Sequence, residues 1–229
     1  MGTIVNATHY ALPNNNSPQN VTIPSTAAHN VLVVTINTLN GGVTPSSTGS
    51  SYVSKANFAS PNVWNHEQVY SWYNINSGVT TVTMSYGAAQ ALEGWVFEVS
   101  GSQQAVDPFD GVNSLQNAFN ATNLGCGSIT PTGNGIAISI MDDVTGNVAS
   151  YTQGAGWTPG TTTAGSYYQF RSTSSGVSVG GNTNQATAPV GNNGEVDGII
   201  FTLDDFVNAS TDIFFAGGDE WQWLGGDWR

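Results

Sequence analysis

The chain has 229 residues, of which 39% are hydrophobic, 10% aromatic and only 8% charged. Fifteen Asp and Glu residues stand against three cations, Lys55, Arg171 and Arg229, which gives a formal net charge of −12. Such a chain repels phosphate backbones and anionic membranes and has few donors for phosphorylated substrates, so we expect neither nucleic acid nor a membrane as a partner.

The hydrophobic and aromatic content is high enough for a folded core, either one large all-β domain or two small ones. Cys126 is the only cysteine, which excludes an intramolecular disulfide and any zinc site built on a cysteine cluster. The segment that follows Met1 has no basic region and no apolar core of a signal peptide, so we expect no export signal. The longest apolar run, 31–36, is too short to span a bilayer.

Residues 1–20 contain the loop-like run Pro13-Asn14-Asn15-Asn16-Ser17-Pro18. We interpret this stretch as an N-terminal arm or an edge segment of the domain that follows, which we place at residues 21–203.

Within residues 21–203, short segments rich in Val, Ile, Thr, Tyr and Trp alternate with clusters of Gly, Asn, Ser and Pro. This pattern predicts strands separated by turns. The predicted strands are 21–24, 30–38, 51–57, 67–75, 80–86, 92–100, 135–141, 148–151, 166–171, 176–179, 185–188 and 196–203. A single short helix is expected at 114–120, and we find no repeat of fixed period. The fold class we expect is all-β: a two-sheet antiparallel β-sandwich, jelly-roll or immunoglobulin-like, with extended N- and C-terminal arms.

The composition changes after Leu203. Residues 204–229 are acidic, aromatic and broken by glycine pairs, and such a segment suits docking into a groove on another surface or on its own domain. The candidate partner-docking residues are Phe206, Ile213, Phe214, Phe215, Trp221, Trp223, Trp228 and Arg229. Of these, Arg229 is a candidate ionic latch to acidic neighbours.

The segment order resembles a family of lectin-like β-sandwich modules found in bacteriophage virion proteins and bacterial surface proteins. The matching segments are Asn30-Val31-Leu32-Val33-Val34, Val69-Tyr70-Ser71-Trp72-Tyr73, Thr80-Thr81-Val82-Thr83-Met84, Gly94-Trp95-Val96-Phe97-Glu98-Val99-Ser100-Gly101 with Asp107-Pro108-Phe109-Asp110, Gly135-Ile136-Ala137-Ile138, Gly156-Trp157-Thr158 and Asp197-Gly198-Ile199-Ile200-Phe201-Thr202-Leu203. The resemblance covers about residues 20–203 and implies a sandwich that displays loops or binds surfaces, with no catalytic residues to transfer.

Together with the absent export signal and the aromatic tail, this resemblance leads us to expect a non-enzymatic structural protein on the surface of a phage particle. A capsid decoration protein anchored by its terminal arms is the first hypothesis, with the major capsid protein, other virion proteins or further copies of the chain as partners. The alternative is a tail-fibre or receptor-binding module that recognises host glycans.

Candidate catalytic and metal-binding residues are few. Glu93 and Glu98 are five positions apart on one predicted strand, so they should point to opposite faces and cannot form a glycosidase pair by themselves. The three histidines lie next to predicted loops, without a nucleophile at a recognisable spacing. Asp142-Asp143 and similar pairs could bind Ca²⁺, but none has the spacing of an EF-hand loop, so we expect no metal and no cofactor.

Aromatic side chains in predicted loops are candidates for stacking on sugar rings. We consider Trp64, Trp157 and Tyr167 as possible glycan-stacking residues, although most aromatics of a sandwich belong to its core.

Overall fold

The structure is a computed structural model in which residues 2–38, 40–47, 53–59, 66–101, 107–117, 123–142, 151–163, 165–180, 184–186 and 196–205 are described. These residues form strands and turns only, and the sheets are antiparallel. The all-β prediction is confirmed. The expected helix at 114–120 is wrong at least as far as Asn117, because Phe109–Asn117 is a strand.

The first half of the chain carries eight strands, β1 (Thr3–Asn15), β2 (Gln19–Thr22), β3 (Val31–Thr38), β4 (Thr44–Ser47), β5 (Val53–Ala59), β6 (His66–Trp72), β7 (Thr81–Ser85) and β8 (Gln90–Ser100). The second half carries β9 (Phe109–Asn117), β10 (Asn123–Leu124), β11 (Ser128–Ile129), β12 (Gly135–Asp142), β13 (Tyr151–Thr152), β14 (Thr158–Thr163), β15 (Ser166–Thr173), β16 (Val179–Gly180), β17 (Asn184–Ala186) and β18 (Val196–Asp204).

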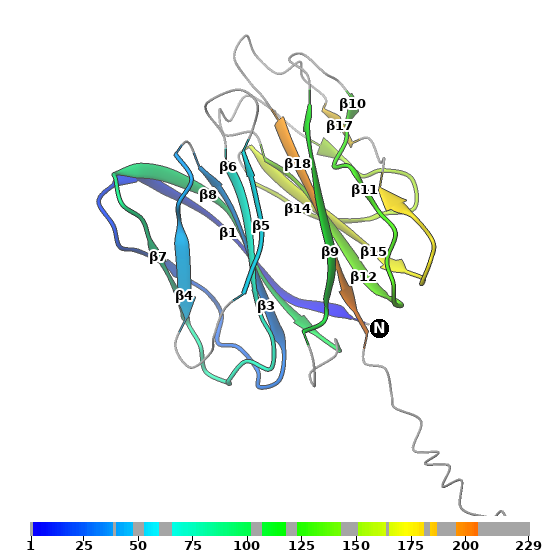
Figure 1. Ribbon diagram of the computed structural model, residues 1–229, viewed down its shortest axis with the longest axis horizontal. Helices are drawn as coiled ribbons and strands as arrows, with labels where there is room; N and C mark the ends of the chain where they lie inside the picture. The colour runs from blue at the N-terminus through cyan, green and yellow to red at the C-terminus, as the bar shows by residue number, and fades with distance from the viewer. Residues whose placement is uncertain are drawn as a thin grey trace, which may run out of the picture.

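The sheets stack in layers (Figure 1). The first central sheet has the order β1-β8-β3-β6-β5, and the second central sheet has the order β14-β15-β12-β18-β9. The two pack face to face through a cluster that includes Val33 and Phe97 from the first sheet and Ile138 and Phe201 from the second. This pair is consistent with a β-sandwich.

Both central sheets are also covered on their outer faces. The sheet β2-β7-β4 packs on the first through Val82 and Met84, and the small sheets β10-β17-β13 and β11-β16 pack on the second. We expected two sheets, and the described residues form five. The apolar runs in β3 and β12 follow from this layering, because a strand buried on both faces has no solvent side to fill with polar residues. Every residue of both strands is buried.

The same strand arrangement occurs twice. The places of β1, β8, β3, β6 and β5 in the first central sheet are taken by β9, β18, β12, β15 and β14 in the second, and the covering order β2-β7-β4 matches β10-β17-β13. The pairing registers also agree. Asn37 lies opposite Glu93 and Glu67, while Asp142 lies opposite Asp197 and Ser166 at the equivalent positions.

A bulge recurs at the same point of both edge strands. In β1, Ile4 pairs with Val99 and Asn6 with Glu98, so Val5 is skipped; in β9, Phe109 pairs with Leu203 and Gly111 with Thr202, so Asp110 is skipped. Bulges are specific local features, so a shared one supports a repeat of the whole unit. The sequence Leu92-Glu93-Gly94-Trp95-Val96-Phe97 has its counterpart in Val196-Asp197-Gly198-Ile199-Ile200-Phe201. Unequal loop lengths between equivalent strands explain why a search for a fixed period does not reveal the repeat.

The two ends of the described chain lie side by side. The backbone nitrogen of Gly2 donates to Asp205 Oδ1, and Figure 1 shows the N-terminus next to the end of β18. Residues 3–15, which we expected to be an arm or an edge segment, form the edge strand β1. The tail from Phe206 lies outside the described residues.

Candidate functional site: a buried polar layer between the two halves

Six polar side chains form a layer at one end of the contact between the central sheets. On the first sheet, β8, β3 and β6 place Glu93, Asn37 and Glu67 in one row across three neighbouring strands. On the second sheet, β18, β12 and β15 place Asp197, Asp142 and Ser166 in the equivalent row.

Both rows point into the space between the sheets. Side chains alternate along a strand, and Glu93 shares its face with Trp95 and Phe97, which belong to the contact between the halves. On the second sheet Asp142 shares its face with Ile138 and Ile140 of the same contact. Glu98 lies on the opposite face of β8, against the first covering sheet, so the prediction that Glu93 and Glu98 point apart is confirmed.

Hydrogen bonds connect the first central sheet to the second row across the interface. Trp95 Nε1 donates to Ser166 Oγ at 2.5 Å, and Ser166 Oγ donates in turn to Asp142 Oδ1. At the rim, His9 Nε2 lies 2.9 Å from Glu93 Oε1, and the His9 ring lies 5.1 Å from the Trp95 ring. One side chain of the first half is thus joined to a carboxyl group of the second through a single hydroxyl.

The environment of the layer favours protonated carboxyl groups. Glu67, Asp142 and Asp197 are 5%, 1% and 3% exposed. Burial raises the pKa of Asp142 to about 7, although the hydrogen bond from Ser166 and the charge of His9 lower it. Burial also raises the pKa of Glu67 well above its usual value, and the carboxylates of Asp197 and Asp142 raise it further. Both shifts have the sign expected for acids removed from water and placed beside other acids.

Several polar atoms of the layer have no hydrogen-bond partner. These are Oε1 of Glu67 and both amide atoms of Asn37, whose side chain is 1% exposed. Buried polar groups almost always form hydrogen bonds, so buried atoms without a hydrogen-bond partner reduce the stability of the fold at this layer.

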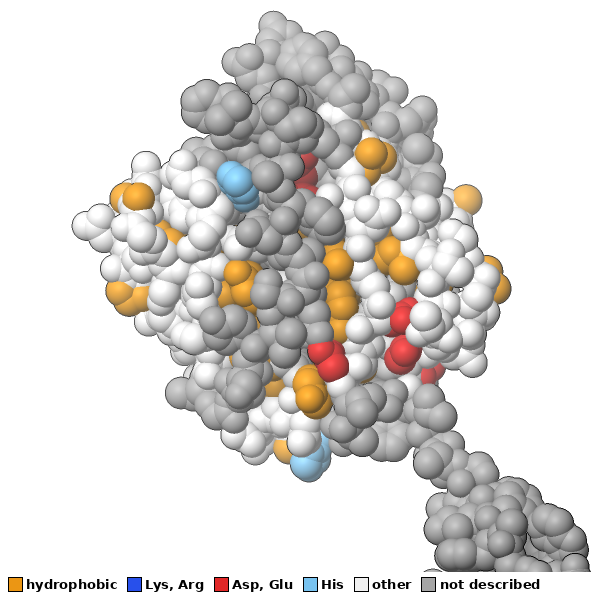
Figure 2. Space-filling model, in the orientation of Figure 1, with side chains coloured by type: hydrophobic (Ala, Val, Ile, Leu, Met, Phe, Trp, Pro, Cys, Tyr) orange, Lys and Arg blue, Asp and Glu red, His pale blue; other side chains and the backbone are white. Residues whose placement is uncertain are grey.

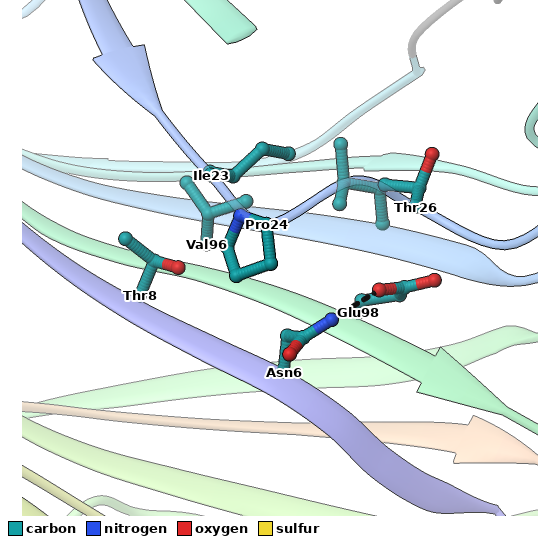
Figure 3. A pocket seen from close by; sticks show the side chains of 8 residues that line it. Asn6, Thr8, Ile23, Pro24, Thr26, Val96 and Glu98 are labelled. Atoms are coloured by element: carbon teal, nitrogen blue, oxygen red, sulfur yellow. Dashed lines mark hydrogen bonds between the residues drawn. The ribbon is translucent and has the colours of Figure 1, made fainter. Parts of the chain in front are cut away.

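A second buried carboxylate has the opposite character. Glu98 Oε1 accepts hydrogen bonds from the Ala27 backbone nitrogen at 2.8 Å and from Asn30 Nδ2 at 2.7 Å, and Oε2 accepts from Asn6 Nδ2 at 2.7 Å. Figure 3 shows Glu98 and Asn6 pointing toward one another beside Pro24. The surrounding pocket has no room for a water molecule, so this carboxylate has a structural role: it holds β1 and the loop before β3 onto β8.

The part of the chain that the structure describes contains no group of metal-ligating side chains and no membrane-spanning helix. Its His, Cys, Asp and Glu residues form no group of three or more that could hold a metal ion, and no described helix has the length and hydropathy of a membrane span. Cys126 is buried beside the small sheets, and burial raises the pKa of its thiol to about 11.

Two of the three candidate glycan-stacking residues, Trp157 and Tyr167, are buried. Trp157 is 5% exposed and packs in the cluster beneath the small sheets, and Tyr167 is 2% exposed and stacks on Tyr151 with ring centroids 5.4 Å apart. Trp64 lies outside the described residues, as do all eight candidate docking residues of the tail. Figure 2 shows a face of mostly neutral polar side chains with scattered apolar and acidic ones, and no described Lys or Arg is visible on it.

Sequence reasoning missed the buried layer. The sequence pattern relates Glu93 only to Glu98 and Asp142 only to Asp143, because it gives no reason to place the first central sheet across from the second. The acidic residue before glycine in both Glu93-Gly94 and Asp197-Gly198 was the available signal.

Comparison with known proteins adds no assignment: the sequence matches no protein-family model, no curated protein and no solved structure.

Proposed function

We propose that the chain is a non-enzymatic structural protein of a bacteriophage particle, and specifically a capsid decoration protein on the virion surface. In this proposal the β layers form a rigid body, and residues 206–229 attach it to the major capsid protein, to other virion proteins or to further copies. The acidic, neutral-polar exterior keeps densely packed copies soluble.

The observation that carries the proposal is the strand order. Each half places β1-β8-β3-β6, or its equivalent β9-β18-β12-β15, against a covering sheet of order β2-β7-β4 or β10-β17-β13. We interpret this as two jelly rolls in tandem, with the fifth strand of each unit shifted to the central sheet. Jelly rolls are a common architecture of viral particle proteins, and the same architecture also serves lectins, so the fold supports the proposal by analogy.

The position of the chain ends supports attachment at one point. Since Asp205 receives a hydrogen bond from the Gly2 nitrogen, the tail leaves the body beside the start of β1. With residues 3–15 paired in a sheet, the proposal assigns anchoring to the C-terminal tail alone. The apolar tail residues would bury their side chains on the partner, and Arg229 would pair with a carboxylate there.

Deletion of residues 206–229 tests this proposal. We expect the shortened protein to keep its melting temperature within about 2 °C, because the described sheets are complete without the tail, and to lose association with purified particles. A full-length control in which Phe206, Ile213, Phe214, Phe215, Trp221, Trp223 and Trp228 are replaced by Ser separates loss of apolar contacts from loss of length. Unchanged incorporation of both variants would contradict the proposal.

The receptor-binding alternative predicts a different result. Trp157 and Tyr167 are buried, so among the described candidates no ring favours glycan binding. Binding of the isolated protein to host surface glycans, with the tail deletion having no effect, would favour this alternative.

A further inference from the structure

The buried layer sits where the two halves of the chain meet. Four carboxyl groups, on Glu67 of β6, Glu93 of β8, Asp142 of β12 and Asp197 of β18, come from both central sheets, with His9 of β1 at the rim. Tyr10 of β1 is the other titratable group in reach, and after burial the charges of Asp142 and Glu93 are what raise its pKa.

Among the side chains that the structure describes, positive charge is scarce around this layer. Arg171, the one arginine among the described residues, lies on β15 and faces the other way, with its guanidinium carbon 5.9 Å from the centre of the Trp157 ring. His9 is the only group among the described side chains that lies within ion-pair distance of one of these acids. Protons are therefore the simplest way to neutralise Glu67 and Asp142 at this depth.

We infer that the layer is a proton-operated joint between the two halves: protonated Glu67 and Asp142 allow the central sheets to close, and their ionised forms weaken the contact. Oε1 of Glu67 and the side-chain amide of Asn37, which have no hydrogen-bond partner, lie in the same layer. If the sheets separated, water could form hydrogen bonds with these donor and acceptor atoms. This inference does not depend on the proposed virion function.

The direction of the pH effect follows from the raised pKa values. Between the ordinary carboxyl pKa near 4 and the value of about 7 for Asp142, the folded state binds more protons than the unfolded state. The stabilisation from burying the neutral acids is therefore complete at low pH, and it is lost as the pH rises from about 4 to about 7. The protein should therefore be more stable at pH 5 than at pH 8.

Thermal unfolding of the full chain at pH 5 and pH 8 tests this inference. We expect the melting temperature to be roughly 5–10 °C higher at pH 5, from the part of the Asp142 shift that lies in this interval. Asp142→Asn keeps an oxygen that accepts the hydrogen bond from Ser166 but removes the titrating group. The difference in melting temperature between pH 5 and pH 8 should therefore fall to half of the wild-type value or less. Glu67→Gln should act in the same direction by raising the melting temperature at pH 8.

Asp107→Asn is the matched control, because it removes the same formal charge from an aspartate outside the layer. Asp107 lies in a loop, and its Oδ1 accepts a hydrogen bond from the Phe109 backbone nitrogen. This variant should show the same difference in melting temperature between pH 5 and pH 8 as the wild type. If Asp142→Asn does not fold, Glu67→Gln decides the question, since Glu67 Oε1 has no partner to lose.

Two results would overturn the inference. One is an equal pH dependence in wild type, Glu67→Gln and Asp142→Asn, which would assign the effect to the general surface charge. The other is a melting temperature at pH 8 that rises with added Ca²⁺ and falls with a chelator in wild type but not in Asp142→Asn, which would mean that a cation fills the layer.

Discussion

Two buried acids of this protein show how differently the same functional group is used. Glu98 receives three hydrogen bonds and joins three segments of the first half, whereas Glu67 is equally buried and has an oxygen without a partner. A carboxylate surrounded by donors is stabilised in its charged form, while a carboxyl group surrounded by other acids is stabilised in its neutral form. Burial alone therefore does not reveal the role of an acid; its partners do.

Replacing Glu98 by Ala should leave the Ala27 nitrogen and the amides of Asn6 and Asn30 without their acceptor. We expect a loss of about 3 kcal/mol or more in the free energy of unfolding, measured by urea denaturation. Glu98→Gln keeps one oxygen for two of the donors, and the Asn6 amide can turn to accept from the new NH₂ group, so its cost should be about 1 kcal/mol. A Glu98→Ala protein as stable as Glu98→Gln would contradict the structural role.

At the scale of elements, the sequence predicted the inner strands most closely and several edge strands less well. The apolar strands β3, β12 and β18 were predicted nearly to their bounds, because burial on both faces leaves a dense run of Val, Ile and Leu. The edge strands β9 and β14 were not predicted, and β1 was expected only as an arm or an edge segment, since these strands carry Thr, Asn, Gly and Pro, which are typical of loops.

The sequence could not predict the buried polar layer for a related reason. Its six residues come from six strands spread from β3 to β18, and only the packing of the second central sheet on the first brings them together. The two facing rows become visible once the registers of the sheets are known, because Asn37 and Asp142 then occupy equivalent positions.

The repeat makes a prediction at two equivalent glycines. A Cβ at Gly94 would lie 2.1 Å from the Thr35 carbonyl oxygen, and a Cβ at Gly198 would lie 2.1 Å from the Gly125 carbonyl oxygen. Backbone cannot yield cheaply to such contacts, so Gly94→Ala and Gly198→Ala should each cost about 3 kcal/mol or more in urea denaturation.

Gly87→Ala is the control for these two variants, because nothing lies within 4 Å of its added Cβ. Its stability should change by no more than about 0.5 kcal/mol. The carbonyl group belongs to the neighbouring strand β3 for Gly94 and to the segment between β10 and β11 for Gly198, so a stable alanine variant at either position would contradict the close backbone contact there.

At the scale of the whole molecule, the protein is a stack of β layers built from one unit used twice. The two halves meet through their central sheets, with aromatic and aliphatic side chains over most of the contact and acids at one end. The apolar part holds the halves together at any pH, and the acidic part makes that contact sensitive to protons. Both ends of the described chain, Gly2 and Asp205, lie at one point of this stack.

Location on a virus particle tests the central functional claim most directly. Electron microscopy of purified particles, labelled with an antibody raised against the described β layers, should show label distributed over the capsid surface, and particles assembled with the 206–229 deletion should be unlabelled. Label confined to the tail tip, or particles that carry no copy of the chain, would contradict the account.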